Sequence, residues 1–297
     1  MGDEGHHFAT LRGLQVGKVV HQEPLGERAD DGESGNLAHE HRNRIGLVAS
    51  LAVRPVVVIP TFNERENIVD LLRVLRARVP EAHLMVVDDL SPDGTGELAD
   101  AAAAELGEVT VVHREGRPGL GAAYRHGFAL AFAEGFDVVV SMDSDFSHDP
   151  AVIPTMLGLI EGGADVVIGS RYVAGGGTQD WPMRRRLLSR WGNRYTGWLL
   201  GAKVRDCTAG FRAYRADVLQ RIDPASTAAE GYAFLTELTR RLARSGANIV
   251  ETPILFKDRE KGTSKMSARI IVESMLLVTG WGILDRWRDL RQRFTKG

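Results

Sequence analysis

The sequence predicts an α/β fold with a mainly parallel, Rossmann-like sheet flanked by helices. Two observations lead to this class. From Pro55 onward, short runs of β-branched residues alternate with stretches whose apolar residues recur at helical spacing. The runs are apolar at successive positions, which is typical of parallel strands that are buried on both faces.

The elements follow one another in regular order. The expected strands are 56–59, 84–87, 109–112, 137–141 and 165–168, and a strand-like run follows at 249–256. The expected helices are 68–75, 98–106 and 119–134. In such sheets ligands bind beyond the carboxyl ends of the strands. Residues that directly follow a strand are therefore the first candidates for a functional site.

Composition and charge limit the classes of protein to which the chain can belong. The chain has 297 residues, 43% of them hydrophobic, which suffices for one large domain with appendages. A formal net charge of -2 argues against nucleic-acid binding. The single cysteine, Cys207, cannot form an internal disulfide, which favours the cytoplasm. The apolar stretch 270–284 is too short to span a bilayer, and no signal-peptide pattern is present. We expect a protein that touches a membrane without crossing it.

Residues 1–54 differ from the rest of the chain. They hold five of the nine histidines, frequent glycine and acidic residues, and no sustained periodicity. Such a segment buries too little apolar surface to offset the entropy lost on ordering. The histidine spacings fit no metal-ligand pattern. We expect a largely disordered extension.

Polar residues follow the first two strands. The segment 60–64 (Pro-Thr-Phe-Asn-Glu) by itself is typical of a turn before an acidic helix start. The segment 91–94 (Ser-Pro-Asp-Gly) is a second turn, and Thr95 is a candidate cap for the next helix. That turn does not explain the adjacent carboxylates Asp88 and Asp89. A carboxylate at this edge can accept paired hydrogen bonds from a ribose or a base.

The clearest chemical signal follows the fourth strand. Asp143 and Asp145 stand one residue apart, and their charges repel unless a cation or a proton intervenes. Mg²⁺ and Mn²⁺ prefer oxygen ligands and bridge to substrate phosphates. After the fifth strand, Arg171 places a cation at the same edge, either as a solvated surface residue or as a partner for phosphate.

Together these segments resemble the family-2 glycosyltransferases of GT-A fold. Among them the chain is most similar to the polyprenyl-phosphate (dolichol-phosphate) mannose synthases. The resemblance covers about residues 55 to 268, and its motifs are jointly specific. It is carried by 60–64, 87–95, 119–121, 142–145 and 169–171, and later by 206–212, 230–234 and 259–265.

The resemblance implies a role for individual residues. The residues that would line the nucleotide pocket are Pro60, Phe62, Glu64, Val87 and Asp89. Those that would hold Mg²⁺ or Mn²⁺ and the donor are Asp143, Ser144, Asp145 and, as a further metal ligand, Ser147. Those that would grip phosphates of donor or acceptor are Arg171, Arg259 and Lys265. The candidate catalytic residues are Asp145 and these three cations.

Two positions depart from the family pattern. Phe62 stands where tyrosine is common, so the stacking face is kept and the hydroxyl lost. Ala209 stands where serine is common, so any role of that hydroxyl is absent.

The implied chemistry agrees with these residues. Cleaving a sugar–pyrophosphate bond builds negative charge on the leaving diphosphate, which a metal ion stabilises. A phosphate monoester acceptor is already anionic at neutral pH and needs no strong base. Arg259 and Lys265 lie in a segment that by itself reads equally well as a flexible basic loop.

A lipid acceptor would fit the second half of the chain. All five tryptophans lie there, interleaved with arginines at 184–194 and 286–293. Tryptophan, leucine and arginine mixed on helices are typical of membrane interfaces, although tryptophans also pack cores and arginines also solvate surfaces. Because the expected acceptor is a lipid, we prefer the interpretation that these residues lie at a membrane interface.

We therefore expect a disordered extension (1–54), a GT-A catalytic domain (55–268) and an amphipathic, membrane-associating C-terminal helix (269–297). The expected reaction is metal-dependent, inverting transfer of mannose from GDP-mannose to a polyprenyl phosphate. We expect it at the cytoplasmic face of the membrane. A membrane-anchoring protein is a possible partner. The alternatives are hexosyl transfer from a UDP-sugar and a non-catalytic nucleotide-sugar-binding subunit. A dinucleotide-binding dehydrogenase is disfavoured, because no Gly-x-Gly-x-x-Gly follows the first strand.

Overall fold

The computed structural model describes residues 53–258 and 268–294. All of them belong to one compact unit, Ala52–Gly297. Of the extension expected at 1–54, residues 1–52 lie outside the described residues. Arg259 and Lys265 also lie outside them.

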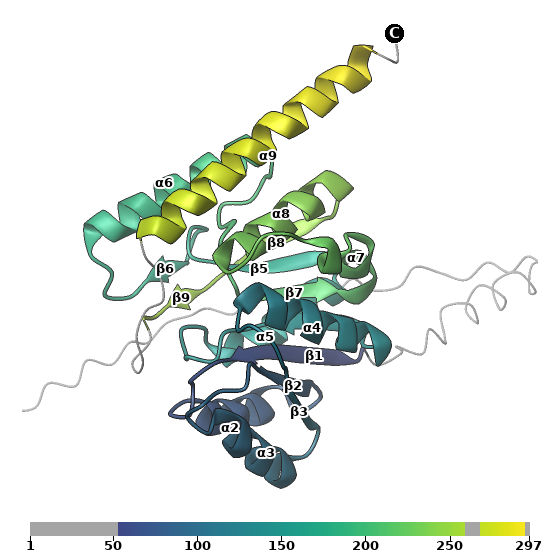
Figure 1. Ribbon diagram of the computed structural model, residues 1–297, viewed down its shortest axis with the longest axis vertical. Coiled ribbons are helices and arrows are strands. Elements are labelled where there is room, and N and C mark those ends of the chain that lie inside the picture. The colour runs from purple at the N-terminus through teal and green to yellow at the C-terminus, as the bar shows by residue number, and fades with distance from the viewer. Residues whose placement is uncertain (1–52, 259–267, 295–297) are drawn as a thin grey trace, which may run out of the picture. The chain divides into compact units, whose positions relative to one another are not determined.

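The central sheet has seven strands in the order β3-β2-β1-β4-β7-β5-β8 (Figure 1). Their bounds are β1 Pro55–Thr61, β2 His83–Asp88, β3 Val109–His113, β4 Val138–Ser141, β5 Val166–Ser170, β7 Arg212–Arg215 and β8 Ile249–Pro253. Neighbouring strands are parallel except where β7 pairs with β4 and β5. The predicted α/β class with a mainly parallel sheet is confirmed.

Among the strands of the central sheet, the antiparallel strand β7 is the one that the sequence pattern did not place. It lies between β4 and β5 and pairs with both. The strand ends that precede Asp145 and Arg171 are therefore separated by one strand. The turn that enters β7, residues 206–211, lies beside both of them, because an antiparallel strand begins at the edge where its parallel neighbours end.

The strands are buried on both faces, as their continuous apolar runs predict. Along β1, Val56 and Val58 belong to one core and Val57 and Ile59 to the other, and all four are inaccessible to solvent. The core at Val56 includes residues of α4 and α8, and the core at Val57 includes residues of α2, α3 and α5. The sheet is thus the middle layer between two layers of helices.

The helices are α2 Ile68–Arg78, α3 Thr95–Leu106, α4 Leu120–Ala133, α5 Ile153–Glu161, α6 Met183–Leu200, α7 Ala216–Arg221, α8 Tyr232–Ser245 and α9 Ala268–Phe294, with 3₁₀ turns η1 Pro150–Val152 and η2 Pro224–Ser226. A two-stranded parallel sheet pairs β6 Gly177–Thr178 with β9 Leu255–Phe256. These bounds match the predicted helices 68–75, 98–106 and 119–134 to within a few residues.

The long helix α9 lies along α6 (Figure 1). Gly282 of α9 permits this approach, because a Cβ at this position would collide with the Leu199 side chain of α6. Among the described helices, none combines the length and the apolar character needed to cross a bilayer.

Helix α4 packs directly on the sheet at Gly127. A Cβ built there would lie 2.5 Å from Val58 Cγ1 and 3.1 Å from Val87 Cγ2. We expect Gly127→Ala to lower the free energy of unfolding by about 1–3 kcal/mol, the usual range for overpacking a core. The matched control is Gly158→Ala in α5, where a Cβ would meet no atom within 4 Å. That change should raise stability by about 0.5–1 kcal/mol, because alanine favours the helix. Urea unfolding measures both, and equal effects of the two would contradict this account of the α4 packing.

Candidate active site

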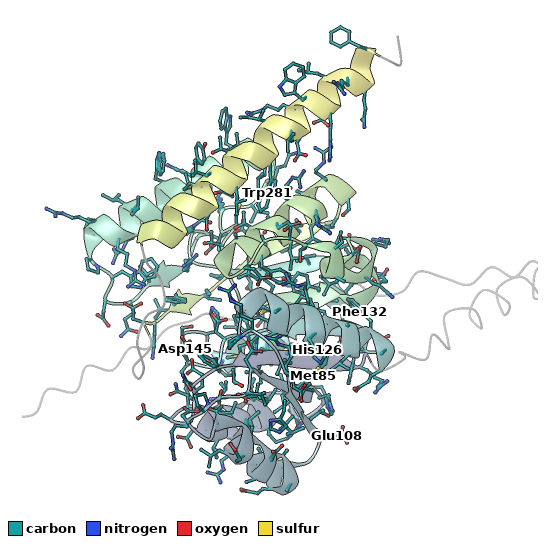
Figure 2. The ribbon with its side chains drawn as sticks, in the orientation of Figure 1. Met85, Glu108, His126, Phe132, Asp145 and Trp281 are labelled. Carbon is teal, nitrogen blue, oxygen red and sulfur yellow. The ribbon has the colours of Figure 1, made fainter. Side chains whose placement is uncertain are left out.

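The loops after β1, β2, β4 and β5 meet at one edge of the sheet. The strand register sets Thr61 beside Asp88, so β1 and β2 end together, whereas β4 ends at Ser141 beside Val58 and its loop begins three residues earlier. Asp145 follows β4 at this edge (Figure 2). The fold thus gathers the predicted strand-end residues where ligands of such sheets bind.

Asp88 joins the first two loops and has a structural role. Its Oδ1 accepts hydrogen bonds from Thr61 Oγ1 (2.7 Å) and Ser91 Oγ (2.6 Å), and its Oδ2 accepts one from Ser91 N (2.9 Å). The expectation that turn chemistry leaves Asp88 unexplained is therefore wrong. The Ser91 turn closes on this carboxylate, and Thr61 ties it to β1.

Thr95 also differs from its expected role. The residue that caps α3 is Gly94, which has a left-handed backbone, and Thr95 is the first residue of the helix. Its hydroxyl donates to Asp93 Oδ1 (2.6 Å) and accepts from Glu64 N (2.9 Å). Thr95 therefore fastens the loop after β2 to the loop after β1.

Asp89 is buried, and both of its oxygens accept hydrogen bonds from the chain. Oδ1 accepts from Arg114 Nε (2.6 Å), and Oδ2 accepts from Gly119 N at the start of α4 (2.7 Å). A carboxylate has further lone pairs, so a nucleotide group can still bind. The structure adds Arg114 and Gly119 to the set of residues at the predicted nucleotide pocket.

The other predicted pocket residues divide into two groups. Phe62 and Glu64 are half-buried in the loop after β1. Pro60 and Val87 are buried partners in the strand register. The Val87 side chain belongs to the core near Gly127, so any contact between Val87 and a nucleotide would come from its backbone.

The predicted metal ligands lie close together after β4. Asp143 is partly exposed, whereas Ser144, Asp145 and Ser147 are buried. Ser147 N donates to Asp145 Oδ1 (3.1 Å), which fixes the two residues relative to each other. The Ser147 hydroxyl is buried and has no hydrogen-bond partner among the described residues.

This oxygen set fits a hard divalent cation. Two carboxylates and one unsatisfied hydroxyl suit Mg²⁺ or Mn²⁺, and neither a thiolate nor a third carboxylate joins them among the described residues. An ion held by these three residues would still need further oxygen ligands, which substrate phosphates could supply.

His148 belongs to this site, although sequence reasoning did not select it. Its ring is 2% exposed and stacks on Phe211, with 5.1 Å between the ring centroids. Its Nδ1 accepts a hydrogen bond from Asp143 N (3.4 Å). Burial lowers the pKa of His148, although the charges of Asp143 and Asp145 oppose this effect. The imidazole is therefore neutral at pH 7 and keeps the lone pair that accepts from Asp143. Its position directly after the predicted ligand Ser147 was the signal in the sequence.

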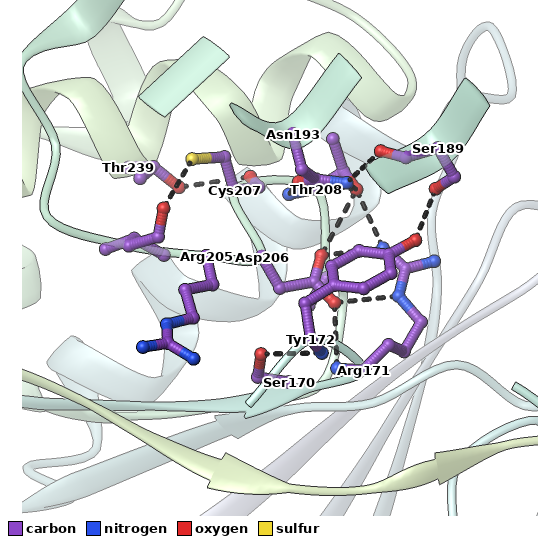
Figure 3. Close-up of polar contacts among 12 residues, drawn as sticks. Ser170, Arg171, Tyr172, Ser189, Asn193, Arg205, Asp206, Cys207, Thr208 and Thr239 are labelled. Carbon is purple, nitrogen blue, oxygen red and sulfur yellow. Dashed lines mark hydrogen bonds and ion pairs between the residues drawn. The ribbon is translucent and has the colours of Figure 1, made fainter. Parts of the chain in front are cut away.

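Arg171 is held by a carboxylate of its own chain (Figure 3). Its Nε donates to Asp206 Oδ2 (2.7 Å) and its Nη2 to Asp206 Oδ1 (2.6 Å) and Thr208 Oγ1 (2.8 Å). Burial opposes the charge of Arg171, but Asp206 outweighs this effect and raises the pKa of Arg171 well above its ordinary value. The cation expected to grip phosphate is thus permanently charged but already bound on one side, and a solvated surface role is excluded because its side chain is only 10% exposed.

The same network reaches helix α6 (Figure 3). Tyr172 Oη donates to Ser189 Oγ (2.6 Å), and Asn193 Nδ2 donates to Thr208 Oγ1 (3.2 Å). Ser189 and Asn193 are four residues apart and therefore lie on one face of the helix. The inner face of α6 is thereby hydrogen-bonded to the surroundings of Arg171.

Trp181 has a different position from the one predicted. It is buried, and its indole N–H donates to Asp258 Oδ1 (2.9 Å). Arg185 stacks on its ring at 3.8 Å and also donates to Asp258 (2.7 Å). Trp181 therefore packs inside the domain and does not belong to an interfacial surface.

Comparison with known proteins adds to this geometry. A family model described as "Glycosyl transferase family 2" matches residues 56–223. Polyprenol monophosphomannose synthase of Mycolicibacterium smegmatis is 47% identical over 241 residues, which cover 80% of this chain and 91% of the relative. Undecaprenyl-phosphate mannosyltransferase of Micrococcus luteus is also 47% identical over 241 residues, covering 81% and 99%.

Solved structures show the same fold. Glucosyl-3-phosphoglycerate synthase of Mycobacterium tuberculosis with phosphoglyceric acid superposes with a TM-score of 0.59 at 22% identity, covering 77% of this chain and 81% of that one. Its complex with Mn²⁺, UDP-glucose and phosphoglyceric acid has a TM-score of 0.57 at 22% identity, covering 77% and 80%. At this identity the similarity concerns the fold, and it confirms the predicted GT-A architecture.

The buried pair Arg171–Asp206 should contribute strongly to stability. Asp206→Asn leaves the guanidinium without its counter-charge, and we expect it to lower the free energy of unfolding at pH 7 by about 3–5 kcal/mol. The matched control is Asp217→Asn at the exposed pair Arg215–Asp217, which should change it by about 1 kcal/mol or less. Urea unfolding of the three proteins measures the difference.

The pH dependence of this difference follows from the pKa of Asp206. Burial alone would raise it, but Arg171 holds it below the ordinary value. The stabilisation is therefore complete above the unfolded carboxyl's pKa of about 3.9 and is lost as the pH falls through the lower folded pKa. If the difference in the free energy of unfolding between wild type and Asp206→Asn stayed constant down to the lowest pH at which both proteins fold, the result would contradict stabilisation by this ion pair.

Proposed function

The chain belongs to glycosyl transferase family 2, and from that premise we propose that it transfers mannose from GDP-mannose to a polyprenyl phosphate. The reaction releases GDP and inverts the anomeric centre. The observation that carries this proposal is the 47% identity to two polyprenyl-phosphate mannosyltransferases, which extends over most of this chain and of both relatives. The oxygen cluster at Asp143, Asp145 and Ser147 agrees with it.

We assign these three residues to a Mg²⁺ or Mn²⁺ ion that also contacts the donor. When bound, the ion neutralises charge on the departing diphosphate. The chain's own contribution is to hold the ligands rigidly: Ser147 N fixes Asp145, and His148 fixes the Asp143 backbone. Such preorganised ligands need no rearrangement during the reaction.

The acceptor is proposed to need no general base. A phosphate monoester carries negative charge at neutral pH, so its oxygen attacks the anomeric carbon without losing a proton to the protein. Cations must then bring two anionic groups together. Arg171, Arg259 and Lys265 are proposed for this task, and Arg171 keeps the required charge through Asp206.

The acceptor lipid is proposed to reach the site from a membrane bound by α6 and α9. We call the exposed apolar residues of these helices the α6–α9 surface: Met183, Leu187, Leu188, Trp191, Trp198, Leu276, Leu277, Ile283, Leu284, Trp287, Leu290 and Phe294. Exposed arginines accompany them, and Arg286 stacks over Trp198 at 4.6 Å. Apolar side chains beside arginines suit an anionic bilayer surface. We propose that the protein binds the cytoplasmic face of the membrane. A membrane-anchoring partner protein would bind the same α6–α9 surface.

The donor and the metal can be tested in one assay. Purified protein is given labelled GDP-mannose or UDP-glucose with a polyprenyl phosphate, and the labelled lipid is measured. We expect transfer from GDP-mannose, its loss on chelation and its recovery with added Mg²⁺ or Mn²⁺. Transfer from UDP-glucose alone would replace the proposed donor.

In this assay Asp145→Asn removes one charge from the metal site. We expect turnover to fall by about 10²-fold or more, the scale for losing one electrostatic stabiliser of a transition state. The matched control is Asp149→Asn in the same loop. Its carboxylate is exposed and, within the described part of the chain, accepts a hydrogen bond only from Ala151 N (2.9 Å), so activity should stay near wild type. Normal turnover of Asp145→Asn in excess chelator would refute the metal-dependent mechanism.

Membrane binding should depend on the arginines of α9. Replacing Arg286, Arg288 and Arg291 by glutamine should weaken sedimentation with anionic liposomes at low salt, and high salt should release the wild type, because the attraction is screened. The control variant replaces the exposed residues Arg65, Arg73 and Arg78 by glutamine, which removes the same amount of charge elsewhere. It should bind the liposomes like wild type. If both triple variants bind equally, α9 is not the contact.

A further inference from the structure

A pocket lined by arginines lies between α7, α8 and α9, away from the candidate active site. It has a volume of about 380 Å³ and is lined by Arg221, Ile222, Arg240, Arg241, Arg244, Ser245 and Arg288. Five of these seven residues are arginine, and none is acidic. Like charges around one pocket repel each other, whereas an anion that enters the pocket is attracted by all of them.

The pocket is separate from the proposed donor and metal site. Helix α7 begins directly after β7, which ends at Arg215 beside Val138, the first residue of β4. Helix α8 ends shortly before β8, which begins at Ile249 beside Val166, the first residue of β5. The pocket therefore lies toward the edge of the sheet where β4 and β5 begin, whereas Asp145 follows the end of β4. Its arginines have no part in the proposed transfer reaction.

Buried carboxylates hold two of the arginines in place. Arg240 donates from Nε to Asp285 Oδ2 (2.6 Å), and Asp285 is 5% exposed. Arg241 donates from Nη2 to Glu237 Oε1 (2.7 Å), and Glu237 is also 5% exposed. The side chains of Arg240 and Arg241 are themselves only 14% and 22% exposed. Guanidinium groups fixed in this way lose little conformational entropy when an anion binds.

Two further arginines are held only loosely. Arg221 approaches Asp217 at 3.7 Å, which is too long for a hydrogen bond. Arg288 is exposed and forms no ion pair within the described part of the chain. Among the described residues, the carboxylates that pair with the five arginines are Asp217, Glu237, Asp285 and Asp289. Five guanidinium groups thus face four carboxylates, and positive charge is in excess at the pocket.

We propose that this pocket binds a phosphate group, supplied by the headgroup of an anionic phospholipid. Guanidinium groups match phosphate oxygens with paired hydrogen bonds. The sequence of α9 favours a lipid as the source, because Arg288 follows Trp287 and lies four residues after Leu284, both of the α6–α9 surface. Residues four apart share one face of a helix, so one lipid can reach Leu284 and Arg288 together. The lipid source rests on the proposed membrane contact, whereas phosphate binding by the pocket does not.

The test replaces the two loosely held arginines. The pocket variant combines Arg221→Gln with Arg288→Gln. The matched control combines Arg78→Gln with Arg286→Gln, which removes the same amount of charge, again with one change in α9. All four side chains are exposed, so both variants should unfold at the wild-type temperature in chloride buffer.

Inorganic phosphate tests the pocket without a membrane. Thermal unfolding of the full chain is followed in rising phosphate at constant ionic strength, because a ligand of the folded state raises Tm. Phosphate bound at the active site contributes equally to both variants and cancels in their comparison. The rise in Tm should be smaller in the pocket variant, corresponding to about 10-fold weaker binding at the pocket, the scale of one charge-assisted hydrogen bond. An equal rise in the pocket variant and the control overturns the proposal.

Vesicles identify the source of the phosphate. Sedimentation is measured with phosphatidylcholine vesicles that contain phosphatidylglycerol, and with vesicles of equal surface charge that contain cholesteryl hemisuccinate, whose anionic group is a carboxylate. On phosphatidylglycerol the pocket variant should bind about 10-fold more weakly than the control. On the carboxylate vesicles the two variants should bind alike. A difference of the same size on both kinds of vesicle overturns the assignment to phosphate, because charge alone then explains it.

The two measurements also separate the parts of the proposal. If inorganic phosphate distinguishes the variants and phosphatidylglycerol does not, the pocket binds a free phosphate group and the lipid source is wrong. If the wild type binds neither kind of vesicle, the proposed membrane contact is refuted, and the phosphate titration still decides whether the pocket binds phosphate.

Discussion

The buried guanidinium of Arg212 is the interaction on which the site edge depends. It is inaccessible to solvent and donates from Nε to Ala209 O (2.7 Å), from Nη2 to Cys207 O (2.9 Å) and from Nη1 to Leu235 O (3.1 Å). A buried charge is costly unless its donors are satisfied, so the turn before β7 and the first turns of α8 must adopt the shape that presents these carbonyls. The position of residues 206–211 follows from this requirement.

The functional residues on either side depend on the same turn. Asp206 begins the turn and binds Arg171, and Gly210 near its end lies beside the Asp143 carboxylate. Ser141 Oγ also donates to Gly210 O (2.7 Å), which joins the end of β4 to the turn. One antiparallel strand therefore links the proposed metal ligands to the proposed phosphate-binding cation, although the strands that carry them are not neighbours.

The network around Arg171 also connects chemistry to the proposed membrane surface. Helix α6 presents Ser189 and Asn193 toward Tyr172 and Thr208, and exposes Trp191 and Trp198. A helix can do both because residues four apart share a face while intervening residues point elsewhere. A lipid surface bound at α6 would thus lie one helix thickness from the cation that is proposed to meet its phosphate.

The sequence alone determined the layered α/β fold, since runs such as 56–59 are apolar at every position and only a sheet covered on both faces buries them fully. It also identified the strand-end candidates Asp143, Asp145 and Arg171 and the family. Only the tertiary structure decided which partners those residues have. Arg171 binds Asp206, 35 positions away, and the Val87 side chain packs in the core. Strand order and the competition among nearby polar groups depend on packing across the whole domain, and no local pattern in the chain records them.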